Sequence, residues 1–339
     1  MKILVTGAGG FLGKVIVERL LAHGQTDLRA MVRDTAKADG IRQIAAKYPD
    51  ATVEIVAVNL RHPPEIPAAI GGCGIVIHAA AALKGSAAEM FMDSVVASRN
   101  LLDAVMKAPA TRIVLVSSFG VFGVAVLDRF AIVDERTPME ERPENRDIYS
   151  HSKLRQEQLF WEYRAKQPYE LVVLRPGVIY GPGGGHFSTR VGLNMFGTFL
   201  HLGGRNPLPL TFVENCAEAI VVAALEPTAN GEVYNVIDDD LITANQYLRL
   251  YKRQVKPMRS IKVPFSVMML LSKVVERYST SSKGQLPAVF TPYKTRVMWG
   301  GNRFSNAKLK GIGWKPLIST KDALAQTFAS FKAEPPKLK

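Results

Sequence analysis

The stretch Met1-Lys-Ile-Leu-Val-Thr-Gly-Ala-Gly-Gly-Phe-Leu-Gly13 decides the fold of this chain. Ile3 to Val5 form an apolar run that is too short for a helix and is bounded by glycine, which predicts a buried strand. The spacing of a dinucleotide-binding turn follows, carried by Gly7, Gly10 and Gly13. An amphipathic run from Phe11 to Leu21 predicts a helix whose N-terminal amides point at a pyrophosphate. A plain glycine-rich turn is the alternative, but a strand before it and a helix after it favour cofactor binding.

The composition is that of an ordinary globular protein, with 47% hydrophobic and 22% charged residues among 339. A chain of this length can hold one large or two intimate domains with an ample core. Met1 leads directly into the first strand and no apolar run is long enough to cross a bilayer, so we expect no signal peptide and no membrane span. The two cysteines, Cys73 and Cys216, form no metal-ligand pattern, so we expect no metal and a reducing, cytoplasmic location.

Charge is distributed unevenly along the chain, whose formal net charge is +13. Residues 241–339 hold nineteen Lys and Arg against three acidic residues, a net charge of +16, so residues 1–240 come to −3. This asymmetry indicates an anionic partner for the C-terminal third, and a merely solvated basic face is the alternative. Among anionic partners we expect a membrane surface or an acidic substrate rather than nucleic acid.

Strand and helix signals alternate through the first half of the chain. Helical patterns at 90–106 and 149–166 lie between short apolar runs, which predicts a doubly wound parallel sheet covered on both faces. The expected strands after the first are 28–32, 53–58, 74–78, 111–117 and 171–175, with 232–236 returning to the same sheet. We therefore predict an α/β fold with a dinucleotide-binding Rossmann domain over residues 1–178. A smaller, mainly substrate-binding domain would occupy residues 179–339.

The end of the second strand distinguishes the two nicotinamide cofactors. NAD would need a carboxylate there for its ribose 2′-hydroxyl. The segment Ala30-Met31-Val32 has none, and Arg33 follows it, where a guanidinium can fork onto a 2′-phosphate. We favour NADP(H), although an arginine stacked on adenine would serve NAD(H) equally. Further cofactor contacts are expected from Phe11 and Leu12 in the turn, from Asn59 and Leu60 after the third strand, and from Ala79, Ala80 and Ala81 after the fourth.

The candidate chemistry lies at Ser118, Tyr149 and Lys153. Tyr149 and Lys153 are four residues apart and share one face at the start of a helix. The Lys153 ammonium, together with a positive nicotinamide, is expected to lower the pKa of Tyr149 from about 10 towards the working pH. Tyr149 could then exchange a proton with a carbonyl or hydroxyl oxygen, which Ser118 at the end of the fifth strand could hydrogen-bond. His78, which closes the fourth strand, is expected to be a packed residue rather than a catalyst.

Taken together, these pieces resemble an extended short-chain dehydrogenase/reductase of the NAD-dependent epimerase/dehydratase superfamily. The resemblance implies that Ser118 donates to the substrate oxygen, that Tyr149 is the acid/base and that Lys153 activates it and binds the ribose. It also places Pro176, Gly177 and Val178 beside the nicotinamide. Ser94 is a departure, because the family usually has an asparagine there that serves a water-mediated proton path. The matching segments cover roughly the first 240 residues in order: 6–13, 77–80, 100–104, 116–123, 149–153 and 174–182.

A few positions indicate which branch of the superfamily this chain resembles. Phe119 and Gly120 stand where sugar dehydratases carry an acidic pair, which disfavours dehydration. Nucleotide-sugar epimerases usually carry an arginine just before the segment 211–219, whereas 207–211 has no basic residue and Arg205 is the nearest one. The segment 211–219 instead resembles the 3β-hydroxysteroid dehydrogenase and dihydroflavonol reductase branch.

We therefore expect hydride transfer between a nicotinamide cofactor and a secondary alcohol or ketone of a largely apolar small molecule. A nucleotide-sugar epimerase and a non-catalytic NADP-sensing regulatory protein are the alternatives. Substrate contacts are expected from Phe119, Gly120, His186, Phe187 and Arg190, with His186 a loop residue rather than a proton carrier.

The segment Ile261 to Tyr278 is the other informative stretch, and it predicts a helix from Pro264. This helix would place Ser266, Lys273, Glu276 and Arg277 on one side, while the run 268–271 is apolar all round. An apolar helix beside a basic face suits peripheral contact with an anionic membrane, or a lid over an apolar substrate. A core helix or a homodimer-forming helix is the alternative.

Overall fold

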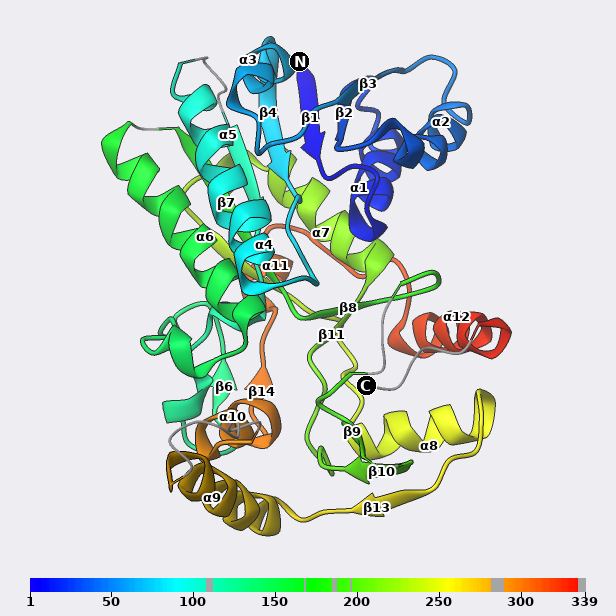
Figure 1. The fold of residues 1–339 in the computed structure, drawn as a ribbon. Helices are drawn as coiled ribbons and strands as arrows, with labels where there is room; N and C mark the ends of the chain where they lie inside the picture. The colour runs from blue at the N-terminus through cyan, green and yellow to red at the C-terminus, as the bar shows by residue number, and fades with distance from the viewer. Residues whose placement is uncertain (108–111, 168, 185–187, 196, 282–289, 335–339) are drawn as a thin grey trace.

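A computed structural model describes residues 1–107, 112–167, 169–184, 188–195, 197–281 and 290–334. Its centre is a parallel sheet of seven strands in the order β3-β2-β1-β4-β5-β7-β12 (Figure 1). The strand order reverses beside β1, so the predicted doubly wound Rossmann sheet is confirmed, including the strand that returns after residue 230. The strands are β1 Lys2–Thr6, β2 Asp27–Val32, β3 Thr52–Ala57, β4 Cys73–His78, β5 Arg112–Val116, β7 Glu170–Pro176 and β12 Val233–Val236.

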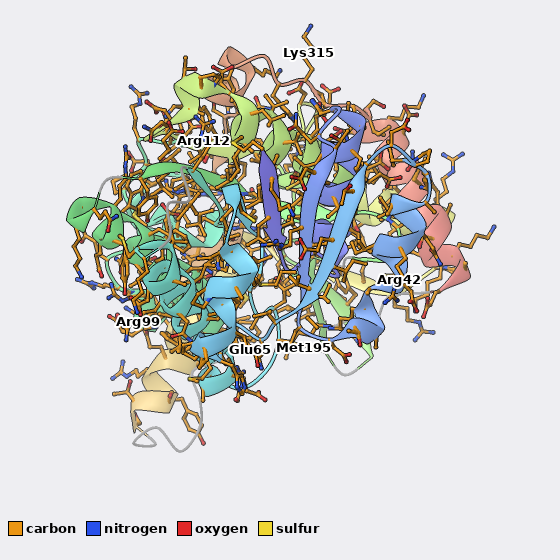
Figure 2. All side chains as sticks on the ribbon, turned by 90° about the horizontal axis from the view of Figure 1, so that it is seen from above. Arg42, Glu65, Arg99, Arg112, Met195 and Lys315 are labelled. Carbon is orange, nitrogen blue, oxygen red and sulfur yellow. The ribbon has the colours of Figure 1, made fainter. Side chains whose placement is uncertain are left out.

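Alternation along the strands builds two cores, one on each face of the sheet. In β1, Ile3 and Val5 belong to the core beneath α1 (Phe11–Ala22) and α7 (Val213–Leu225). Leu4 points to the other core, beneath α3 (Ile66–Ile70), α5 (Ala97–Val105) and α6 (Ile148–Lys166). Seen from above, helices flank the strands on both sides (Figure 2). Because the sheet is covered on both faces, its strands are apolar on both sides, which is why their sequence shows continuous apolar runs.

The helix predicted over 90–106 is interrupted. It consists of α4 (Ala87–Phe91), a wider π-helical turn over Met92–Val96, and α5. The Ser98 hydroxyl donates to the Ser94 carbonyl oxygen over 2.5 Å inside this region. Side-chain bonding into the backbone ladder is a recognised cause of such distortions, and single π turns are frequent at functional sites.

The C-terminal part has a core of its own, in which aromatic side chains of α8 (Ala244–Gln254) and α12 (Thr320–Ala333) pack together. Small sheets support it: β10 (Thr198–His201) lies between β9 (Gly192–Met195) and β13 (Ser260–Lys262), β11 (Leu210–Phe212) pairs with β8 (Val178–Tyr180), and β14 (Arg303–Phe304) pairs with β6 (Ile132–Val133). The remaining helices are α2 (Asp39–Ala45), α9 (Phe265–Ser281), α10 (Pro292–Trp299) and α11 (Ala307–Gly311). Beyond residue 178, β12 pairs with β7 and α7 packs on the same sheet, so the division of the chain into two domains at this point stays a prediction.

Two further findings concern membrane-spanning helices and the cysteine and metal chemistry of the described residues. Within the described residues, no helix combines the length and the apolar character needed to cross a bilayer. Cys73 and Cys216 are both buried and free, and the described His, Cys, Asp and Glu side chains form no cluster that could hold a metal ion.

Candidate active site

The glycine turn between β1 and α1 has the form of a dinucleotide cradle. Gly7 has a φ of 69°, a left-handed conformation that L side chains rarely adopt. A Cβ atom on Gly13 would lie 2.1 Å from the Gly7 carbonyl oxygen, so only glycine lets α1 approach the turn this closely. No side chain of the described residues caps the N-terminus of α1, and the first turn of this helix holds no acidic residue. These amides therefore fit a pyrophosphate.

The other residues predicted to contact the cofactor lie beside this glycine turn. Phe11 and Leu12 are half-buried, and the ring of Phe11 packs against Gly184, where a Cβ atom would lie 2.3 Å from it. Ala80 crosses directly over the turn, since a Cβ atom on Gly7 would lie 2.9 Å from the Ala80 Cα atom. Small side chains at 79–81, all half-buried, leave room for a cofactor backbone.

Arg33 lies beyond the end of β2, where its exposed guanidinium pairs with Asp93 over 3.1 Å. The same carboxylate pairs with Arg61 over 2.5 Å. Asn59 accepts a hydrogen bond from the Arg61 amide, which folds the segment back on itself. Leu60 is buried, and its carbonyl oxygen accepts from the Asn100 side chain. Sequence reasoning missed Arg61 and Asp93, because their nearness to Arg33 depends on contacts between segments that are distant in the sequence.

The structure brings Ser118, Tyr149 and Lys153 together at the carboxyl edge of the sheet. Ser118 follows β5, and its hydroxyl accepts from the Gly120 amide over 3.0 Å and hydrogen-bonds Tyr149. Tyr149 lies in the first turn of α6, whose N-cap Asp147 accepts from the Ser150 amide. One turn further on, the Lys153 ammonium reaches the end of β5 and donates to the Val116 carbonyl oxygen over 2.6 Å.

Burial dominates the electrostatics of this group. Burial lowers the pKa of Lys153 from 10.5 to about 7, although Glu157 opposes the shift. Burial also raises the pKa of the half-buried Tyr149, more than the bond from Ser118 lowers it, and Asp147 adds to the rise. The expectation that Lys153, together with a positive nicotinamide, lowers the Tyr149 pKa concerns the protein with its cofactor bound and stays a prediction. The Lys153 ammonium donates to Val116 and Gln156, and a protonated Tyr149 is suited to donate a proton.

A buried network holds Lys153 from behind. Its ammonium donates over 2.5 Å to the side-chain oxygen of Gln156, whose amide nitrogen donates to the Ser98 hydroxyl over 2.8 Å. Ser98 itself donates to a backbone carbonyl, so it also accepts from His78 Nε2 at 2.9 Å. His78 Nδ1 then accepts from the Thr6 hydroxyl at 2.8 Å. These hydrogen bonds have consistent donor and acceptor roles when His78 is assigned as the neutral tautomer protonated on Nε2.

This network confirms that His78 is a packed residue, because it is buried and burial beside Lys153 lowers its pKa to about 3. The buried Ser94 hydroxyl accepts from the Ala82 amide over 3.2 Å. Gln156 was missed by sequence reasoning. The only signal was its position three residues after Lys153, which puts both on one helix face.

A second buried group ties α6 to the neighbouring strands. Glu157 accepts from Arg175 of β7 over 2.5 Å and from the Ser117 hydroxyl over 2.5 Å. Immediately after β7, Gly177 approaches Pro209 so closely that a Cβ atom would lie 2.2 Å from its carbonyl oxygen. The segment Pro176-Gly177-Val178 is thereby held at the carboxyl edge of the sheet, at the same edge as Ser118.

The predicted substrate residues lie in two places. Phe119 is buried next to Ser118 and packs on Phe304 with 5.6 Å between ring centroids, and Gly120 is half-buried. Arg190 shares a small crevice with Asn302 and Phe304, and its guanidinium donates to the Val297 carbonyl oxygen over 3.4 Å. Phe304 thus joins the Arg190 crevice to the wall beside Ser118. His186 and Phe187 lie outside the described residues.

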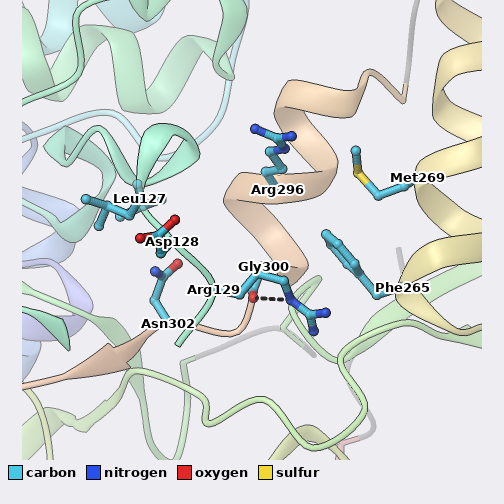
Figure 3. A pocket seen from close by; sticks show the side chains of 9 residues that line it. Leu127, Asp128, Arg129, Phe265, Met269, Arg296, Gly300 and Asn302 are labelled. Carbon is cyan, nitrogen blue, oxygen red and sulfur yellow. Dashed lines mark hydrogen bonds between the residues drawn. The ribbon is translucent and has the colours of Figure 1, made fainter. Parts of the chain in front are cut away.

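A larger cavity of about 240 Å³ lies between α9, α10 and the segment 124–129 (Figure 3). Phe265 and Met269 of α9 form an apolar side of it, and Arg129 and Arg296 lie at its other sides. Asn302 lines both this cavity and the Arg190 crevice, so the two lie next to each other.

Comparisons with known proteins agree with this geometry. The family model for the NAD dependent epimerase/dehydratase family matches residues 3–236. The 2-alkyl-3-oxoalkanoate reductase of Shewanella oneidensis is 28% identical and covers 96% of this chain and 85% of its own length. Cinnamoyl-CoA reductase 1 of Arabidopsis thaliana is 26% identical over 97% of this chain and 89% of its own. Dihydroflavonol 4-reductase of Dianthus caryophyllus is 29% identical over 53% of this chain and 52% of its own.

Among solved structures, the crystal structure of gox2253 is 26% identical and covers 99% of both chains with a TM-score of 0.77. The chain belongs to the NAD dependent epimerase/dehydratase family, the extended short-chain dehydrogenases/reductases. It is accordingly an oxidoreductase that uses a nicotinamide cofactor, and its relatives include carbonyl reductases.

Proposed function

We propose that this protein reduces the carbonyl group of a largely apolar small molecule, with NADPH as the favoured hydride donor. The observation that supports this most directly is the Tyr149 hydroxyl, which shares a hydrogen bond with Ser118 and has a raised pKa. It lies at the carboxyl edge of the sheet, where open α/β sheets bind their ligands.

Each residue of the candidate site has its own role in the proposed reduction. The cofactor, when bound, supplies the hydride. Tyr149 donates a proton to the oxygen of the reacting carbonyl, and Ser118 hydrogen-bonds the same oxygen. Lys153 has one ammonium hydrogen beyond those given to Val116 and Gln156, and this hydrogen is available for the cofactor ribose. Phe119 provides an apolar wall beside the reacting group.

The substrate proposal draws on the surroundings of the site. Phe119 and Phe304 suit an apolar body, and the half-buried Arg190 suits a carboxylate or another anionic group on the same molecule. The names of two relatives, a 2-alkyl-3-oxoalkanoate reductase and a cinnamoyl-CoA reductase, describe carbonyl compounds that carry acidic groups. We therefore propose a ketone or related carbonyl compound with an apolar chain and an acidic end.

Arg33 and Arg61 support the preference for NADP(H). The two guanidinium groups share the Asp93 carboxylate, so they lie near each other beyond the end of β2. A 2′-phosphate could bridge them in place of Asp93. A homodimer and a cytoplasmic location stay predictions from the sequence.

Cofactor turnover with a panel of ketones tests the proposal. Incubation with NADPH and 3-oxoacids of increasing chain length should oxidise the cofactor in proportion to the alcohol formed. A nucleotide-sugar epimerase would interconvert sugar isomers without net cofactor oxidation. An NADP-sensing protein would bind the cofactor and turn over nothing, so the three functions give three different outcomes.

A further inference from the structure

The outer face of α9 is apolar and unusually exposed. Val267, Leu270, Leu271, Val274 and Tyr278 are each between 44% and 64% exposed, and each of them lies three or four residues from another member of the set. Such spacing places all five on one side of a helix. Ile261, just before the helix, is also 59% exposed. The fourteen exposed large apolar side chains of the described residues thus include six within 261–278.

The inner face of α9 is already used by the protein. Met268 and Ser272 are buried, and Phe265 and Met269 line the cavity beside α10 (Figure 3). A surface helix normally turns polar residues to solvent once its inner face is packed. The segment 268–271, predicted to be apolar all round, therefore has one side that packs against the protein and one side that is exposed to solvent.

Positive charge accompanies the uncovered side. Lys262, Lys273 and Arg277 are exposed, and Glu276 is the acidic residue among them. The surrounding C-terminal third carries +16, and α9 lies at the edge of the molecule away from the central sheet (Figure 1). A second copy of the chain would bring these like charges together, whereas an anionic lipid surface would be attracted by them.

We propose that the outer face of α9 binds the surface of an anionic lipid bilayer, with the helix lying in the plane of the interface. The apolar stripe enters the boundary of the acyl chains, and Lys273 and Arg277 meet the lipid headgroups. This attachment is independent of the reduction itself.

Co-sedimentation with vesicles tests the attachment in the full chain. Binding is expected to phosphatidylcholine vesicles that contain phosphatidylserine, is expected to be weak without phosphatidylserine, and is expected to be released by salt. Leu270→Ser with Leu271→Ser should reduce binding at least about tenfold, because it removes apolar area from the interface. Leu317→Ser with Ile132→Ser is the matched control, since both residues are exposed elsewhere, and its binding should equal that of the parent.

Two further measurements show whether the substitutions disturb the fold or cofactor binding. Circular dichroism and cofactor binding should be unchanged in both double variants, because all four positions are exposed. Failure of the parent to bind phosphatidylserine vesicles at low salt would overturn the proposal. Equal vesicle binding by the Leu270/Leu271 double variant and the parent would also overturn it. So would sedimentation in which the parent is a dimer and this double variant is a monomer, because that result would assign the face to a second copy of the chain.

Discussion

Replacing Lys153 with Met should change how the stability of the protein depends on pH. In the folded protein the pKa of Lys153 is lowered to about 7, whereas in the unfolded chain it returns to its ordinary value of 10.5. Between these two values the unfolded state binds more protons than the folded state. The free energy of unfolding of the parent therefore rises with pH across this window.

The size of the effect follows from the two pKa values. Over the interval from about pH 7 to about pH 9.5, this one lysine should add about 3 kcal/mol to the free energy of unfolding of the parent. Lys153→Met has no such contribution. It also leaves the Val116 carbonyl and the Gln156 side chain without a donor, at a cost of roughly 1–3 kcal/mol for each group, but that cost does not vary with pH. The pH slope is therefore the diagnostic quantity.

Urea unfolding of parent and variant without cofactor, at several pH values in this window, measures the difference. Groups that titrate identically in both proteins cancel, and His78 titrates well below the window. Lys321→Met, which removes an exposed lysine from α12, should keep the slope of the parent. If Lys153→Met also keeps that slope, the ammonium is not destabilised by burial and the electrostatic reasoning for this site fails.

Three further predictions concern activity. Tyr149→Phe should lower turnover by at least about 10²-fold with little change in cofactor affinity, and near-normal steady-state turnover would remove Tyr149 from its role. Arg33→Ala should weaken NADPH binding by a few kcal/mol at most and leave NADH nearly unchanged, and calorimetry showing equal affinities in the parent would contradict the cofactor preference. Gln156→Leu removes an acceptor from the Lys153 ammonium and should move the corresponding pKa in the kcat/KM profile to lower pH. Gln156→Glu should move it to higher pH, because a carboxylate stabilises the ammonium, so two shifts in the same direction would refute the positioning role.

The fold could be predicted because its signals are local. Short apolar runs separated by glycine or by helical patterns mark the strands of a covered parallel sheet, and the returning strand near 232–236 was recognisable in the same way. The spacing of Tyr149 and Lys153 along one helix, and the position of Ser118 at a strand end, likewise lie within short segments. These parts of the candidate site follow from the sequence.

The remaining features depend on contacts between distant segments. The π turn over Met92–Val96 is accompanied by bonds from Ser98 and Gln156, and Gln156 belongs to another helix. The rise in the Tyr149 pKa depends mainly on the burial of the phenol, which the spacing of Tyr149 and Lys153 in the sequence does not reveal. For α9, an apolar run shows no periodicity from which to decide which side is covered. Only the packing against α10 distinguishes the two faces.

Tracing the hydride is the most direct test of the central claim that Tyr149, Ser118 and Lys153 serve a carbonyl reduction. NADPH deuterated at the transferred position would be incubated with a 3-oxoacid, and the product analysed by mass spectrometry. We predict one deuterium on the new carbinol carbon, in amounts equal to the NADP⁺ formed, and almost none with Tyr149→Phe. Product that lacks the label, or turnover without net oxidation of the cofactor, would contradict a carbonyl reduction at this site.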